Sequence, residues 1–217
     1  MTSWPWIVLF GLGAYHGANP GMGWLFAVAL GLQEKSRQAV FRSLAPLGLG
    51  HVMSVALAVF VVQLARATLA QRSLKIATAL LLVGFGLYRL LRSRHFRWVG
   101  MRVGPRDLTL WSFLMSSAHG AGLMLAPIVL RLPAATHQEH AHTLQMAAIG
   151  PSSGGLSSAD IILPVAVHSL GYLLVTCVLA FLVYEKLGVS ILRRAWFNLD
   201  LLWACALVGI GLLSLAL

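Results

Sequence analysis

The chain has 217 residues, of which 59% are hydrophobic and only 10% are charged, and its formal net charge is +10. This shortage of polar side chains excludes a water-soluble domain of this size and predicts an all-α, polytopic membrane bundle. The basic residues lie in short links between apolar runs, a pattern that reports membrane orientation and argues against nucleic acid as a partner.

Six apolar segments follow one another along the chain, and each is long enough for a membrane-spanning helix. They cover approximately residues 4–32, 43–65, 74–91, 108–130, 161–184 and 199–217. We therefore expect one transmembrane domain over residues 1–217. Three helices fall in a first half (1–107) and three in a second half (108–217). The second half includes an external loop at 132–160 that contains histidines.

The links between these segments differ in their content of lysine and arginine. The first, third and fifth links contain twelve basic residues, whereas the rest of the chain contains four. Because basic links stay in the cytoplasm, this difference predicts that both termini lie outside. We expect an integral protein of a bacterial inner (cytoplasmic) membrane, with the lipid bilayer as its surroundings. A homo-oligomer is compatible with the sequence.

The first segment contains a polar, helix-breaking cluster near its centre. An apolar run of about 30 residues would extend roughly 45 Å as one helix, whereas the hydrocarbon core is about 30 Å thick. Pro20 cannot donate an N–H to the carbonyl of His16, and Gly21 lets the backbone bend. We predict that the first helix is broken at Asn19-Pro20-Gly21, as in transporters that bind substrate at the membrane midplane. The alternative is a proline kink that serves packing alone.

Short matches between the two halves suggest a 3+3 inverted repeat. His16-Gly17-Ala18 in the first segment recurs as His119-Gly120-Ala121 in the fourth. A proline precedes His51 in the second segment, and another precedes His168 in the fifth. Inverted repeats place a substrate site where the two halves meet, near the midplane.

Four of the histidines lie inside apolar segments. Ionisable side chains at such depths normally face the bundle interior and mark substrate or proton pathways. A neutral imidazole binds transition metals, and imidazole also exchanges protons near physiological pH. The alternative is that each histidine only forms a hydrogen bond between helices. The predicted substrate-binding set comprises His16, Asn19, Pro20, Gly21, Met22, His51, His119 and His168, and its four histidines are the candidate metal ligands.

The fourth link contains a second group of histidines, His137, His140 and His142. If this link is helical, His137 and His140 share one face and could bind a divalent metal ion. The alternative is a disordered polar loop, because Pro151 and a run of serine and glycine follow.

The run from His16 to Gly23, followed by Gly50-His51 in the second segment, resembles the lysine-exporter (LysE-type) superfamily, in particular its nickel–cobalt efflux branch. The resemblance implies six membrane-spanning helices and a histidine-rich link. The site residues that it implies are His16, Pro20, Gly21, Gly23 and His51. Two positions depart from the pattern of the branch, because Asn19 stands where an acid is expected and Met22 where a second histidine is expected. The loss of these ligands points to a softer cation or to an organic solute such as a basic amino acid.

These features favour a secondary transporter that exports a small solute, either a transition-metal cation or an amino acid, in exchange for protons. An enzyme is not expected, because no acid lies deep in a segment to act as a base in hydrolysis. One alternative is a membrane haem protein with His16 and His119 as axial ligands. Another is an assembly factor for a metalloprotein. The residues suggest a transition-metal ion as substrate or ligand.

Overall fold

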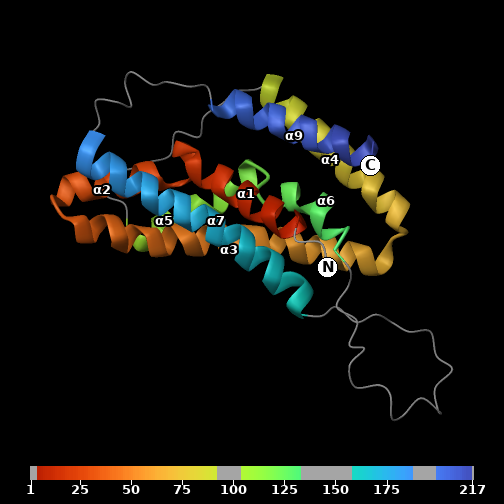
Figure 1. The fold of residues 1–217 in the computed structure, drawn as a ribbon, viewed down its shortest axis with the longest axis horizontal. Coiled ribbons are helices and arrows are strands. Elements are labelled where there is room, and N and C mark those ends of the chain that lie inside the picture. Colours follow the sequence, from red (N-terminus) through yellow and green to blue (C-terminus); the bar gives the residue numbers. More distant parts are fainter. Residues whose placement is uncertain (1–3, 92–103, 133–157, 188–198, 217) are drawn as a thin grey trace, which may run out of the picture.

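In a computed structural model of this protein, the described residues are 4–91, 104–132, 158–187 and 199–216, and all of their regular structure is helical (Figure 1). The predicted all-α class is therefore confirmed for these residues. The elements in chain order are α1 (Trp4–Ala18), the 3-10 turn η1 (Pro20–Met22), α2 (Trp24–Glu34), α3 (Arg37–Thr68), α4 (Gln71–Leu91), α5 (Pro105–Ala118), the 3-10 turn η2 (Leu123–Leu125), α6 (Ala126–Val129), α7 (Ser158–Leu182), the π-helical turn η3 (Val183–Leu187) and α9 (Leu199–Ala216).

The lengths and surfaces of these helices are compatible with a membrane protein. Three helices in the described ranges are long and apolar enough to cross a bilayer, namely α3, α4 and the helix over Ser158–Lys186, and the bent pair α5 and α6 adds a fourth if it is one span. Large apolar side chains face outward, among them Ile7, which is 66% exposed, and Leu91, which is 79% exposed. Water-soluble proteins rarely expose apolar surface on this scale. The count of six spans stays a prediction.

The predicted break in the first apolar segment is confirmed. Helix α1 ends at Ala18, and the chain passes through η1 before α2 begins at Trp24. The side-chain oxygen of Asn19 accepts the N–H of Gly21 at 2.9 Å. The N–H of Asn19 donates to the carbonyl of His16 at 3.1 Å. Pro20 has no N–H to donate to the carbonyl of His16, but that carbonyl accepts from Asn19 instead. Backbone groups at membrane depth need such partners within the protein.

The fourth apolar segment is broken as well, which differs from the single helix expected over 108–130. Helix α5 ends at Ala118, and the helical segment that follows the break is inclined to it by 46°. Gly120 in the break has a φ of +68°, a left-handed conformation that favours glycine. The second apolar segment also differs from its prediction, because α3 begins at Arg37 and extends beyond the expected range of 43–65.

The helices pack in pairs: α1 against α7, α3 against α5, and α4 against α9. Figure 1 shows α4 and α9 side by side at the edge of the remaining helices. Close packing of α1 and α7 depends on glycine, because a Cβ atom on Gly13 would overlap the backbone carbonyl of His168, and one on Gly17 would overlap that of Tyr172. Small residues serve the same purpose at many membrane helix crossings. This pairing brings α1 and the histidine of α7 into contact.

Candidate functional site

Three of the four predicted histidines come together inside the bundle. They are His16 of α1, His51 of α3 and His168 of α7, and none of them has exposed surface. The ring centroids of His16 and His168 are 5.0 Å apart, those of His51 and His168 are 5.4 Å apart, and those of His16 and His51 are 5.9 Å apart. Three separate helices therefore contribute one imidazole each to a single group, which we call the three-histidine cluster.

Each ring of the three-histidine cluster is held through its Nδ1 atom. Nδ1 of His16 lies 2.7 Å from the carbonyl oxygen of Leu12, and Nδ1 of His168 lies 3.2 Å from that of Leu9. Because a carbonyl oxygen only accepts, both Nδ1 atoms donate, and Nε2 of each neutral ring then has the lone pair. Nδ1 of His51 lies 2.9 Å from the hydroxyl oxygen of Ser116. Histidine ligands in metal sites are commonly oriented in this way.

The Nε2 atoms of the cluster are suited to a ligand. Those of His51 and His168 are buried and have no hydrogen-bond partner. The point equidistant from the three ring centroids lies about 3.2 Å from each. A ring nitrogen turned towards that point would be about 2 Å away from it, the length of a metal–nitrogen bond. As the side chains lie, the described residues include no group of three or more His, Cys, Asp or Glu arranged around a common ion. Metal binding therefore requires the rings to reorient.

Tyr172 of α7 connects the three-histidine cluster to the broken first helix. Its ring stacks on that of His51, with centroids 3.8 Å apart and planes inclined by 7°. Its hydroxyl donates to the backbone carbonyl of Met22 at 2.6 Å. Sequence reasoning missed Tyr172, although its position one helical turn after His168 places both side chains on the same face of α7.

The residues of the first break add polar groups without charge. Asn19 is 6% exposed, and its Nδ2 atom is buried without a hydrogen-bond partner. Met22 is 1% exposed. The indole N–H of Trp24 donates to the carbonyl of Ala18 at 3.1 Å, so another carbonyl at the end of α1 is bonded. The predicted break residues therefore lie next to the cluster, joined to it through Tyr172 and through the backbone of His16.

His119, the fourth predicted histidine, lies at the second break and has different partners. Its Nδ1 donates to the carbonyl of Met115 at 2.8 Å, and its Nε2 accepts from Nη2 of Arg89 at 3.3 Å. Arg89 belongs to α4 and has a permanent positive charge. Sequence reasoning missed Arg89 because it was assigned to the third link as an orientation signal.

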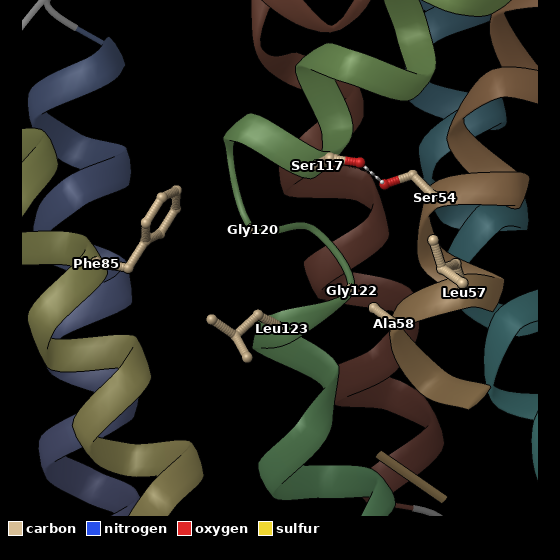
Figure 2. A pocket seen from close by; sticks show the side chains of 8 residues that line it. All are labelled: Ser54, Leu57, Ala58, Phe85, Ser117, Gly120, Gly122 and Leu123. Atoms are coloured by element: carbon tan, nitrogen blue, oxygen red, sulfur yellow. Dashed lines mark hydrogen bonds between the residues drawn. The ribbon is translucent and has the colours of Figure 1, made fainter. Parts of the chain in front are cut away.

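A cavity of about 220 Å³ lies between α4 and the second break. Figure 2 shows Phe85 of α4 on one side and Leu123 on the other, with the hydroxyls of Ser54 and Ser117 joined at one end by a hydrogen bond of 2.9 Å. Ser54 lies one turn after His51, and Ser117 follows the serine that holds His51. The hydroxyl pair is therefore a polar end of a mostly apolar cavity, and its two serines belong to the helices that carry His51 and Ser116. The lining residues are Ser54, Leu57, Ala58, Phe85, Ser117, Gly120, Gly122 and Leu123.

The predicted loop histidines, His137, His140 and His142, lie outside the described residues. A comparison of the chain with protein-family models, with curated proteins and with solved structures found no match. The resemblance to the lysine-exporter superfamily therefore stays a prediction based on the motif residues.

Proposed function

We propose that the protein is an integral membrane secondary transporter that exports a small cation of the transition-metal class through the three-histidine cluster. One observation carries the proposal: imidazoles from three separate helices converge, with centroids 5.0 to 5.9 Å apart, beside a broken helix. Ionisable side chains buried in a membrane protein usually line an ion or substrate pathway. Broken helices at such a site are typical of secondary transporters.

The size of the cluster favours a metal ion over an amino acid, the other substrate that the sequence suggested. Rings at these separations leave room for about one atom between them if their nitrogens bind it directly. An amino acid would also need partners for its ammonium and carboxylate groups. Within the described ranges, no specific contact favours the haem alternative or the assembly-factor alternative.

An inverted repeat would explain how both halves contribute to the site. Each half contains a helix, a 3-10 turn and a second helix in the same order, α1–η1–α2 and α5–η2–α6. In both, the histidine near the break donates Nδ1 to the carbonyl four residues earlier, which belongs to Leu12 in one half and Met115 in the other. If α1 corresponds to α5 and α7 corresponds to α3, the packed pair α1 and α7 of the structure matches the packed pair α5 and α3. These equivalences support alternating access to the cluster from the two membrane faces.

Proton exchange is the driving force that suits this chain. The sequence contains no GxxxxGK[ST] loop for nucleotide binding. Imidazoles that release a metal ion can take up protons, which would couple export of the ion to entry of protons. In this proposal, the cavity beside Ser54 and Ser117 is one access route, and their hydroxyl pair closes it towards the cluster.

The proposal is tested by transport into vesicles that contain the purified full chain and a metal-sensitive dye. We expect the wild-type protein to move a transition-metal ion faster than protein-free vesicles do, with a rate that depends on the pH gradient. His51→Gln or His168→Gln should reduce the rate at least about tenfold, since each removes one of three ligands.

The matched control is His95→Gln, which makes the same substitution at a histidine that belongs to no predicted site. This variant should transport as the wild type does. A wild-type rate equal to that of protein-free vesicles, for every ion tried, would refute the proposal. A rate that ignores the pH gradient would refute proton exchange alone.

A further inference from the structure

An ion pair joins the two halves of the chain at the face that contains the first and fifth links. Nε of Arg37 lies 2.6 Å from Oε1 of Glu185, and Nη2 of Arg37 donates to Oε2 at 2.9 Å. The pair is therefore bidentate, a geometry that fixes the direction as well as the distance between the two side chains. Arg37 is the first residue of α3, and Glu185 belongs to η3 at the end of α7. The pair thus holds together the ends of the helices that carry His51 and His168.

An apolar layer lies between this ion pair and the three-histidine cluster. It consists of the buried side chains Val40, Leu47, Ala180 and Val183, which belong to one hydrophobic cluster. The first two lie on α3 between the ion pair and His51, and the other two lie between His168 and the ion pair. None of the four is more than 5% exposed. The apolar layer therefore separates the histidines from water at this face.

The ion pair lies where it can open and close. The side chain of Arg37 is 67% exposed and that of Glu185 is 23% exposed. Water can replace either partner, and exposed pairs contribute little to the stability of a fold. The four side chains of the apolar layer have no polar atoms, so they lose no hydrogen bonds if their helices part. Opening this face therefore costs less than breaking a buried polar contact.

The turn that holds Glu185 has an unusual geometry. Residues Val183–Leu187 form a π-helical turn, although α7 before them is an α-helix. Turns of this kind are rare and occur frequently at functional sites. A π-helical turn contains more residues than an α-helical turn, so a change between the two would rotate Glu185 about the axis of α7, away from Arg37. The same rotation would move Tyr184 from its position beside Gly31 of α2, the helix that follows the first break.

We propose that Arg37, Glu185 and the apolar layer form a gate between the three-histidine cluster and this face, which the positive-inside rule predicts to be cytoplasmic. In this structure the gate is closed. Separation of the ion pair lets α3 and α7 part at the apolar layer, so that water and the substrate reach the cluster. The inference rests on the proposed function and adds a second access route. The cavity beside Ser54 lies on the other side of His51 along α3.

The first test measures access to the apolar layer and does not require transport. Ala180→Cys is introduced into the purified full chain, with Cys177 and Cys205 replaced by alanine, and its rate of reaction with a small water-soluble thiol reagent is measured. Glu185→Gln should raise this rate about threefold or more, since loss of the ion pair increases the open population. Arg37→Glu combined with Glu185→Arg should restore the slow rate, because the exchanged charges can pair again.

The matched control is Glu34→Gln, which removes an exposed carboxylate from the end of α2 and should leave the slow rate unchanged. Equal reaction rates with and without Glu185→Gln would overturn the gate and leave the proposed function standing. An increase as large in Glu34→Gln, or no recovery when the charges are exchanged, would overturn it in the same way.

The second test locks the gate during transport. Arg37→Cys and Glu185→Cys, in the same chain without Cys177 and Cys205, are joined by a short thiol cross-linker that a reductant cleaves. Transport into vesicles should fall at least about tenfold on cross-linking and return on reduction, because a locked gate cannot leave the closed state. A cross-linked chain that transports at the full rate would refute the gate alone. A wild-type chain that does not transport would refute the proposed function and this inference with it.

Discussion

Tyr172 holds two parts of the candidate site in place with one side chain. Its ring covers that of His51, and its hydroxyl bonds the carbonyl of Met22 in the turn that interrupts the first segment. Both contacts are buried, and Tyr172 has no exposed surface. The orientation of His51 and the position of η1 are therefore linked through this residue.

We expect Tyr172→Phe to lower the free energy of unfolding by about 1–3 kcal/mol, because the carbonyl of Met22 would lose its buried partner while the ring stack remains. Thermal unfolding of the purified protein in detergent measures the change. Tyr88→Phe is the matched control, since Tyr88 is 52% exposed on α4, and it should unfold as the wild type does. Equal effects of the two substitutions would contradict the structural role of Tyr172.

Glycines set the distance between elements as well as the shape of single turns. Along α1, Gly13 and Gly17 face the backbone of α7, whereas Gly11 has no atom within 4 Å of the position that a Cβ would occupy. A methyl group at Gly13 or Gly17 would therefore force α1 and α7 apart, whereas a methyl group at Gly11 would not. Because α1 and α7 contribute two of the three clustered histidines, their separation also controls the spacing of the rings.

We expect Gly13→Ala to destabilise the protein by about 1–3 kcal/mol, because the new methyl group meets the carbonyl of His168, a backbone atom that cannot rotate away. Gly11→Ala should leave stability unchanged or raise it by up to about 1 kcal/mol, since alanine is the better helix former. Both values come from unfolding of the purified variants under one set of conditions. Similar stability of the two variants would mean that α1 and α7 are not in close contact.

The two broken segments differ in how they could be predicted. Asn19-Pro20-Gly21 contains a proline, which removes a helical hydrogen bond, so the first break was predictable from the residue types. The second break, at His119 and Gly120, contains no proline, and its helix could have continued through it by local propensity. Gly120 has a positive φ where the break lies against Phe85 of α4, a tertiary contact that no local pattern contains.

At the scale of the whole molecule, the orientation in the membrane is a prediction that follows from charge. Twelve basic residues belong to the first, third and fifth links. The positive-inside rule then places both termini on the outer face. Single cysteines introduced at position 2, at the C-terminus and in the third link, in a chain whose Cys177 and Cys205 are replaced with alanine, can report this topology.

We expect an impermeant maleimide added to intact cells to label the cysteines at both termini but not the cysteine in the third link. Labelling after the cells are opened is the control that each cysteine is reactive. The reverse pattern would place the termini in the cytoplasm and would contradict the predicted orientation.

By itself, the amino-acid sequence determined the helical class, the apolar segments, the first break and the identity of the buried histidines. These features depend on residues near one another in the chain: apolar runs set the segments, and proline sets the break. Only the tertiary structure decided which histidines meet. His16, His51 and His168 lie on three helices, and their convergence depends on the rotation and separation of those helices, which packing determines. The same packing placed His119 within hydrogen-bond distance of Arg89 and stacked Tyr172 on His51. Such contacts join residues that are distant in the sequence, so the local periodicity of the sequence does not predict them.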